Sequence, residues 1–245
     1  DTVVAKWMQN SYYEGKVESV SDAKIKVKWL DGSNPTDVDL TEVFALPKAG
    51  EKPDVKAGDI VLAKIGTGSY WNGVEIESVD GDVYKVKAEG GQSSNVSAEK
   101  IIKIPADVAA NFKQKSESND FLKQAQAKKP TAPADFKPKE GEKVLGEWAA
   151  NSWYQAKVEK INGDKATLAW EDGTKPSEIS LSKVLPMPAG KSEMPKDGQY
   201  LLVKPESGSK WVYAQTVSVK AGNIEIKLAD GKTRTIKTGE FVLLN

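Results

Sequence analysis

Apolar and polar residues alternate with a period of two over short stretches through most of the chain. Three such stretches open it, at residues 3–7, 13–17 and 25–29. This period is that of half-buried β-strands, because successive side chains of a strand point to opposite faces. Turn-forming pairs such as Asn10-Ser11 and Asp31-Gly32 separate the stretches. The pattern therefore predicts an all-β chain of short antiparallel strands.

One segment follows a different pattern. Residues 106–129 are rich in Ala, Lys and Gln, and their apolar residues recur at roughly helical spacing: Val108, Phe112, Phe121, Leu122 and Ala125. Proline cannot continue a helix, so Pro130 is expected to end it. Residues 130–139 hold three prolines and are predicted to form an extended, semi-rigid connector. Residues 106–140 are thus predicted to be a helix plus a linker, and a domain boundary.

The chain contains an internal duplication. A shift of 141 positions lays residues 3–47 on residues 144–188 without a gap, and a shift of 140 continues the match from Gly68-Ser69 and Trp71 to Gly208-Ser209 and Trp211. A weaker repeat lies within each copy, where Val3-Val4-Ala5-Lys6 is similar to Val61-Leu62-Ala63-Lys64. About 45 residues suffice for a small barrel but not for a sandwich. We therefore expect four barrels, at residues 1–48, 58–105, 141–189 and 198–245.

Aromatic residues mark the first module of each copy. They fall on the inward phase but at strand ends, so we expect each set to meet at one rim of its barrel: Trp7, Tyr13 and Trp29, and then Trp148, Tyr154 and Trp170. A carboxylate follows two residues after each third aromatic, and an asparagine lies in the neighbouring loop: Asp31 and Asp172, Asn10 and Asn151. Electron-rich ring faces around a gap can hold an ammonium group, so each set is a candidate ligand site.

The residues one position before the two tyrosines have the opposite phase. Tyr12 and Trp153 point outward in this pattern and have no core of their own to fill. They are predicted to offer exposed stacking surface, with cover of a neighbouring module as the alternative. Two further alternatives stay open for the rims. Their aromatics could only plug a small core, as in a structural cell-envelope protein, or could stack on a glycan that the amide of Asn10 or Asn151 binds.

Composition excludes several kinds of function. The chain has no cysteine and no histidine, which removes thiolate nucleophiles, ordinary zinc sites and imidazole bases. We therefore predict a protein that is not an enzyme and that uses neither a cofactor nor a metal. Basic and acidic residues number 35 each, so a basic footprint for nucleic acid is absent and such a partner is not expected. Apolar runs are too short to cross a bilayer, so no membrane insertion is expected. The oligomeric state is left open.

The motifs around the aromatics resemble a known family. Val-Val-Ala-Lys-Trp, Tyr13-x-Gly-Lys-Val and Val-Lys-Trp-Leu-Asp-Gly are similar to the Tudor pattern of the Tudor, Agenet and chromo-barrel (royal) superfamily, and residues 144–173 resemble it equally well. The resemblance implies five-stranded SH3-like barrels in two tandem pairs. It also implies that the chain binds methylated lysine or arginine in a peptide or protein partner, with the six rim aromatics at cage positions. The aromatic that many Tudor domains carry after the glycine turn is replaced by Ser33 and Thr174.

The second module of each copy departs from this family pattern. Ile65 and Pro205 stand where a first cage aromatic is expected, while Trp71 and Trp211 are retained. The resemblance then implies that these two tryptophans dock the module on its neighbour. Since the copies match, the two rims are expected to be equivalent and to bind a clustered ligand with avidity.

The absence of cysteine and the first residue Asp1 also bear on localisation. Both are compatible with a mature chain in an oxidising compartment. We expect a secreted or periplasmic bacterial protein, with a cytoplasmic one as the alternative, since cytosolic proteins can also lack cysteine.

Overall fold

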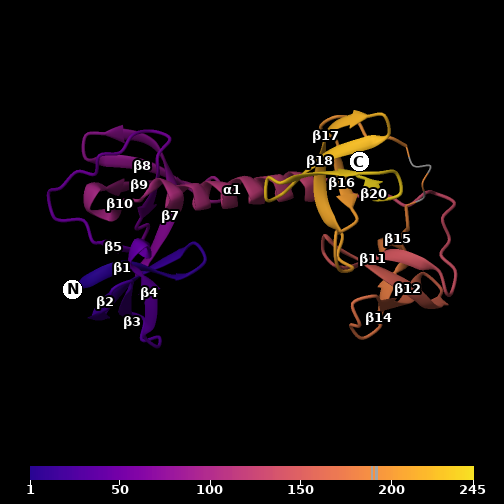
Figure 1. Cartoon of the computed structure of the whole chain (residues 1–245), viewed down its shortest axis with the longest axis horizontal. Helices are drawn as coiled ribbons and strands as arrows, with labels where there is room; N and C mark the ends of the chain where they lie inside the picture. The colour runs from indigo at the N-terminus through magenta and orange to yellow at the C-terminus, as the bar shows by residue number, and fades with distance from the viewer. Residues whose placement is uncertain (189, 191–192) are drawn as a thin grey trace. The chain divides into compact units, whose positions relative to one another are not determined.

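A computed structural model describes residues 1–188, 190 and 193–245 of the chain, which form twenty β-strands and one α-helix in the described part (Figure 1). The chain divides into two compact units, residues 1–116 and 117–245. The boundary falls inside helix α1 (Ala106–Ala127). The prediction of an all-β class is confirmed.

The first unit contains two groups of five antiparallel strands. Within each group the chain order is a meander whose fifth strand returns to pair with the first, so the neighbours run β4-β3-β2-β1-β5 and β9-β8-β7-β6-β10. A short 3-10 helix, η1 (Leu40–Glu42) or η2 (Ala98–Lys100), precedes each fifth strand. The strands are β1 (Thr2–Met8), β2 (Ser11–Val20), β3 (Lys24–Trp29), β4 (Thr36–Asp39), β5 (Val43–Ala45), β6 (Ile60–Ala63), β7 (Tyr70–Asp80), β8 (Val83–Ala88), β9 (Ser93–Ser97) and β10 (Ile101–Lys103).

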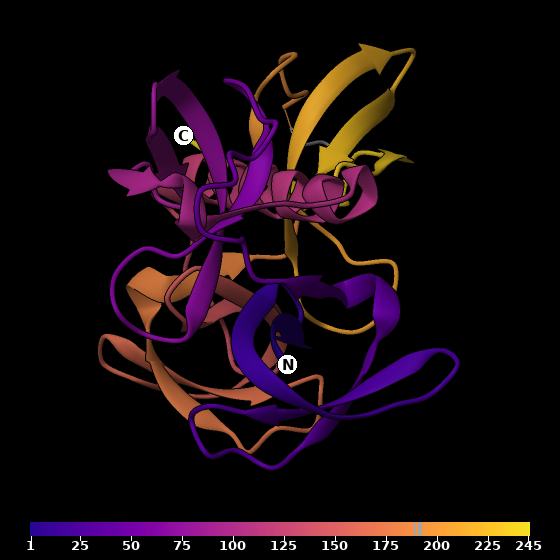
Figure 2. The same ribbon diagram turned by 90° about the vertical axis from the view of Figure 1, so that its left-hand side faces the viewer.

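A short pairing of β2 with β7 joins these two groups. Tyr12 lies opposite Trp71 and Tyr13 opposite Tyr70, so that the unit is one ten-stranded sheet. Each group nevertheless curls around its own apolar cluster, as Figure 2 shows for the indigo and purple strands. A third cluster, centred on Tyr12, Leu62 and Trp71, lies between the groups. The two barrels expected at residues 1–48 and 58–105 stay a prediction, and the sheet shows that β2 and β7 join the two groups.

The second unit repeats this order. Its two meanders are β14-β13-β12-β11-β15, with η3 (Leu181–Lys183) before the fifth strand, and β19-β18-β17-β16-β20. A single bridge between Tyr154 and Lys210 takes the place of the β2–β7 ladder. The strands are β11 (Lys143–Ala149), β12 (Ser152–Asn162), β13 (Lys165–Trp170), β14 (Ser177–Ser180), β15 (Val184–Pro186), β16 (Tyr200–Val203), β17 (Val212–Lys220), β18 (Asn223–Leu228), β19 (Thr233–Ile236) and β20 (Phe241–Leu243).

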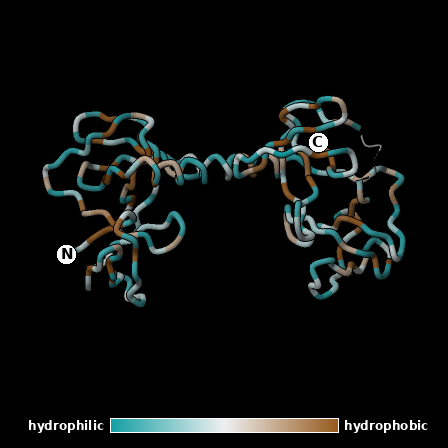
Figure 3. The backbone as a smooth tube through the Cα atoms, in the orientation of Figure 1, coloured by the Kyte–Doolittle hydropathy of each residue, from teal (hydrophilic) through white to brown (hydrophobic). Residues whose placement is uncertain are grey.

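Helix α1 covers the cluster between the groups in each unit with a different half. Val108 and Phe112 pack into the cluster of the first unit, and Leu122 and Ala125 into that of the second. The Phe112 ring rests on Gly73 of β7, where an added Cβ would come within 2.1 Å of a ring atom. Between these halves residues 113–120 are hydrophilic, as the tube colours show (Figure 3). The sequence predicted a helix over residues 106–129, and the helix in the structure ends two residues earlier, at Ala127.

The proline-containing segment after the helix does not form a free connector. Lys129 and Asn245 exchange backbone hydrogen bonds of 3.1 and 3.2 Å, and Pro130 bridges to Leu244. Phe136 packs against the cluster of the β11–β15 group. The apolar ring of Phe136 and the paired backbone bind this segment to the second unit, so the expectation of a spacer between the units is wrong.

Candidate functional site

The structure brings the first aromatic set together at one end of the β1–β5 group. Trp7 is the second-last residue of β1 and has 39% of its surface exposed. Tyr13 is the third residue of β2 and is half-buried, and Trp29 ends β3 with only 3% exposed. Ring centroids of Trp7 and Tyr13 are 5.5 Å apart at 87°, and those of Trp7 and Trp29 are 6.5 Å apart. Gly15 opposite Trp29 leaves space that Val27 fills, since a Cβ there would lie 2.3 Å from Val27. We call Trp7, Tyr13 and Trp29 the first rim.

Trp29 fills the core of its five-strand group. Its ring belongs to the core cluster with Ala5, Val27 and Val38, so it plugs the barrel as the simpler alternative proposed. Its indole N–H donates to the Thr36 hydroxyl at 3.1 Å, which fixes the ring in place. The exposed Trp7 lies against this fixed floor. Burial of one aromatic therefore leaves the outer one available to a ligand.

The second aromatic set forms a pocket. Trp148 is 53% exposed, Tyr154 is half-buried and Trp170 is 6% exposed. The ring centroid of Tyr154 lies 6.1 Å from that of Trp148 and 6.3 Å from that of Trp170, and the plane of the Tyr154 ring is nearly perpendicular to both indole planes. A pocket of about 170 Å³ is lined by these three rings together with Asp172 and Thr174. We call Trp148, Tyr154 and Trp170 the second rim.

Local packing holds the floor of the second rim. The Trp170 indole N–H donates to the Ser177 hydroxyl at 3.0 Å, as Trp29 does to Thr36. Gly146 of β11 lies under the ring, and an added Cβ would be 2.5 Å from Leu168 and 2.9 Å from Trp170. A glycine is therefore needed at this position for the Trp170 ring to lie as it does.

Both rim carboxylates also shape their turns. Asp31 accepts the backbone N–H of Ser33 at 2.9 Å, and Asp172 accepts that of Thr174 at 2.9 Å. These hydrogen bonds to the charged form lower the pKa of each carboxyl below its ordinary value. Both carboxyls are therefore ionised at neutral pH, and Asp172 also lines the pocket of the second rim.

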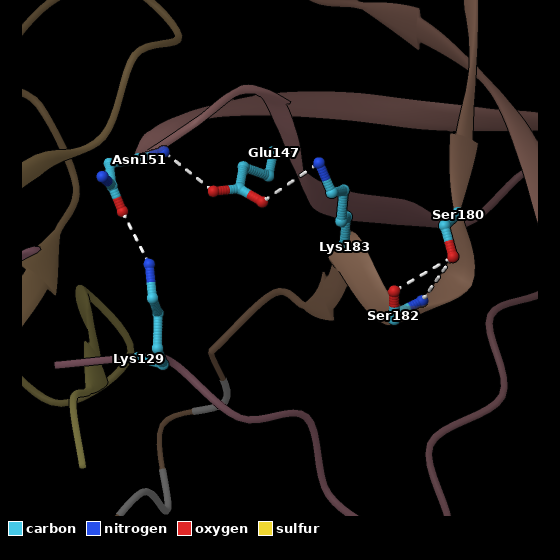
Figure 4. A network of polar contacts seen from close by, with 6 residues as sticks. All are labelled: Lys129, Glu147, Asn151, Ser180, Ser182 and Lys183. Carbon is cyan, nitrogen blue, oxygen red and sulfur yellow. Dashed lines mark hydrogen bonds and ion pairs between the residues drawn. The ribbon is translucent and has the colours of Figure 1, made fainter. Parts of the chain in front are cut away.

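The two rim asparagines serve the turns in which they lie. Asn10 and Asn151 have φ angles of 58° and 59°, a left-handed conformation that asparagine tolerates better than most residues. The Asn151 side-chain oxygen accepts from the Lys129 ammonium at 3.0 Å, and its backbone N–H donates to Glu147 at 2.8 Å (Figure 4). Lys183 contacts the other oxygen of Glu147 at 3.7 Å. The Asn151 amide oxygen is thus engaged within the chain.

Tyr12 and Trp153 are not exposed, so the prediction of outward stacking surface is wrong. Both are buried between the five-strand groups of their units, as the alternative of covering a neighbouring module expected. The ring centroid of Tyr12 lies 5.8 Å from that of Phe44 and 5.9 Å from that of Phe112. Burial raises the pKa of the Tyr12 hydroxyl to about 12. The outward face of β2 or β12 is covered because a second group packs on it.

Trp71 and Trp211 dock one group on the other, as the resemblance implied. Both are buried in the clusters between the groups. The Trp71 indole donates to Glu14 at 3.0 Å, and Glu14 also pairs with the Lys64 ammonium at 2.7 Å. In the amide orientation that satisfies its neighbours, Gln155 accepts from the Trp211 indole at 3.0 Å.

Sequence reasoning missed one residue at each rim. The ring of Tyr70 lies 5.0 Å from that of Tyr13, and the ammonium of Lys210 lies 5.8 Å from the ring centroid of Tyr154. Both come from the second five-strand group, whose modules lack a rim of their own. Their position directly before Trp71 and Trp211 could have indicated them, since those tryptophans mark the joint.

Within the described ranges, no group of three or more Asp or Glu side chains is arranged to hold a metal ion. No helix among the described residues is long and apolar enough to cross a membrane.

Comparison with known proteins adds a likeness of fold. No family model and no curated protein matches the sequence. Solved structures that match include the AGD34 fragment of Arabidopsis thaliana AGDP1, at 17% identity and a TM-score of 0.31, covering 52% of this chain and 88% of that one. The four MBT repeats of Drosophila melanogaster Sfmbt, in complex with the peptide RHR(me)KVLR, match at 9% identity and a TM-score of 0.20, covering 99% and 87%.

A third match comes from extended-Tudor 10-11 of Drosophila melanogaster, at 11% identity and a TM-score of 0.23, covering 100% of this chain and 78% of that one. The three matches are thus described as an AGD34 fragment, four MBT repeats and an extended-Tudor segment. Because these TM-scores are below 0.5, the likeness carries no argument about function.

Proposed function

We propose that this chain is a non-catalytic binding protein whose two rims receive the cationic side chain of a peptide or protein, with methylated lysine or arginine as the ligand class. The observation that carries the proposal is the pocket of about 170 Å³ at the second rim, where three aromatic rings and the ionised Asp172 face one space.

The size of this pocket suits a single side chain. Sites for drug-sized ligands and cofactors measure about 300–1,000 Å³, so a pocket of 170 Å³ is small for them. Aromatic faces attract a cation within about 6 Å of the ring centroid by roughly 0.5–2 kcal/mol. A methylated ammonium presents apolar methyl groups to Trp148 and Trp170 and keeps its charge near Asp172. This combination of apolar contact and charge favours it over an unmodified, strongly hydrated ammonium.

A glycan finds less support at the same rim. Stacking on Trp148 would be possible for a sugar face, but the Asn151 amide oxygen that was expected to bind a hydroxyl is engaged by Lys129. Salt separates the two ligands, because a cationic group loses affinity as the charge of Asp172 is screened whereas a neutral sugar does not.

The proposal is tested by titrating the full chain with a peptide that contains one trimethyllysine and with its unmodified counterpart, by isothermal calorimetry. We expect the methylated peptide to bind more tightly, and the double variant Trp7→Ala, Trp148→Ala to lose this binding. Both side chains are exposed, so the fold should be retained. Val217→Ala, which also removes exposed apolar surface, is the matched control and should bind as the parent does. Equal binding of both peptides, or unchanged binding by the double variant, would contradict the proposal.

A further inference from the structure

The joint between the five-strand groups places a different residue beside the tyrosine of each rim. In the first unit Tyr13 pairs with Tyr70, and in the second Tyr154 pairs with Lys210. These positions correspond in the duplication, because Tyr70-Trp71 aligns with Lys210-Trp211.

One backbone hydrogen bond at this joint recurs in both units, although a single bridge in the second unit takes the place of the β2–β7 ladder. Glu14 donates its N–H to the Ser69 carbonyl at 2.9 Å, and Gln155 donates to the Ser209 carbonyl at 2.9 Å. Trp71 within β7 and Trp211 directly before β17 are then both buried. The side chain beside the rim tyrosine is therefore one difference between the two rims.

That side chain changes the electrostatics of the rim tyrosine. The Tyr70 ring adds a fourth aromatic at 5.0 Å from Tyr13, tilted by 48°. Burial raises the pKa of the Tyr70 hydroxyl, so this ring is neutral at physiological pH. In the second unit the Lys210 ammonium, 5.8 Å from the Tyr154 centroid, is within the range of a cation–π contact. Tyr154 thus already has a cation from its own chain.

On the basis of the proposed function, we propose that Lys210 is a specificity-determining residue that weakens the binding of a cationic side chain at the second rim, whereas Tyr70 strengthens it at the first. Lys210 contacts the ring of Tyr154 without lining the pocket, so a ligand ammonium in the pocket and the Lys210 ammonium would both lie against this ring and repel each other. Asp172 offsets part of this repulsion. The two rims are therefore not equivalent, contrary to the expectation from the duplication, and a methylated side chain binds the first rim preferentially.

Reciprocal exchange of the two residues tests this inference, with one rim measured at a time. In the full chain carrying Trp7→Ala, only the second rim reports, and Lys210→Tyr and Lys210→Gln should each tighten binding of the trimethyllysine peptide about fivefold, the effect of roughly 1 kcal/mol of like-charge repulsion. In the chain carrying Trp148→Ala, Tyr70→Lys should weaken binding by a similar factor. Lys210 is exposed, so circular dichroism should show an unchanged fold.

The outcomes separate this inference from the function on which it rests. If the second rim binds the peptide but Lys210→Gln leaves the affinity unchanged, Lys210 does not determine specificity and the proposed function stands. If neither rim binds in the parent chain and Lys210→Gln gains nothing, both are overturned. Binding at the second rim that is gained only after Lys210→Gln supports the inference directly.

Discussion

Lys6 and Glu42 form an ion pair in the first unit, and the residues at the same repeat positions of the second unit form it with the charges exchanged. Glu147 stands where Lys6 does, and its carboxylate lies 3.7 Å from the ammonium of Lys183. Ser180 accepts the N–H of Ser182 and so caps the short helix that carries Lys183 (Figure 4). Both units therefore have an attractive ion pair between these two positions, but the position that carries the positive charge in one unit carries the negative charge in the other.

This exchange predicts how variants of the pair behave. Lys6→Glu should lower the free energy of unfolding of the first unit by about 1 kcal/mol, because two carboxylates then face each other at a partly exposed position. The double variant Lys6→Glu, Glu42→Lys recreates the arrangement of the second unit and should restore most of the loss. Urea denaturation measures the free energy of unfolding of both variants. A double variant no more stable than Lys6→Glu would show that attraction between the two charges does not stabilise the unit.

The contact of Phe112 with Gly73 predicts a stability effect on the helix. Gly73→Ala should destabilise the first unit by about 1–3 kcal/mol, because its Cβ would overlap the ring unless the helix shifts. Gly68→Ala is the matched control, since nothing lies within 4 Å of a Cβ there. Thermal unfolding followed by circular dichroism compares them, and equal melting temperatures would show that Phe112 does not rest on Gly73.

The lowered pKa of Asp172 predicts the pH dependence of ligand binding. Its carboxyl stays ionised well into the acid range, because the Thr174 N–H stabilises the charged form. Affinity of the second rim for the trimethyllysine peptide should therefore stay constant through mildly acidic pH and fall only below the ordinary carboxyl pKa of 3.8. Calorimetry of the Trp7→Ala chain at a series of pH values measures this. Asp172→Asn should bind weakly at every pH, and a fall in affinity well above 3.8 would assign the effect to another group.

The buried tyrosines predict an alkaline limit to stability. Burial raises the pKa of Tyr12 and of Tyr213 from 10.0 to about 12. Since the folded-state pKa is the higher one, their contribution is fully present below pH 10 and is lost as the pH rises through about 12. Tyr12→Phe cannot ionise and should flatten this decline for the first unit. Urea unfolding across this range tests it, and a decline equally steep in Tyr12→Phe would contradict the assignment.

The sequence by itself determined the features that depend on local pattern. Strict alternation predicted the strands at residues 3–7, 13–17 and 25–29, because a period of two leaves one face of a strand to be buried. The spacing of Val108 and Phe112 predicted the helix, and Pro130 its end, because proline lacks the N–H that a helix requires. The duplication located both aromatic sets. Their meeting at a rim followed from their common phase.

Only the tertiary structure decided what lies between the five-strand groups. Tyr12 and Trp153 look exposed within one module, and they are buried because a second group packs on the outward face of their strand. Tyr70 and Lys210 reach the rims through the same joint, which pairs residues more than fifty positions apart. Alternation along a strand specifies which face is apolar but not which other strand covers it. Contacts between modules therefore could not be predicted from the sequence pattern and are seen only in the tertiary structure.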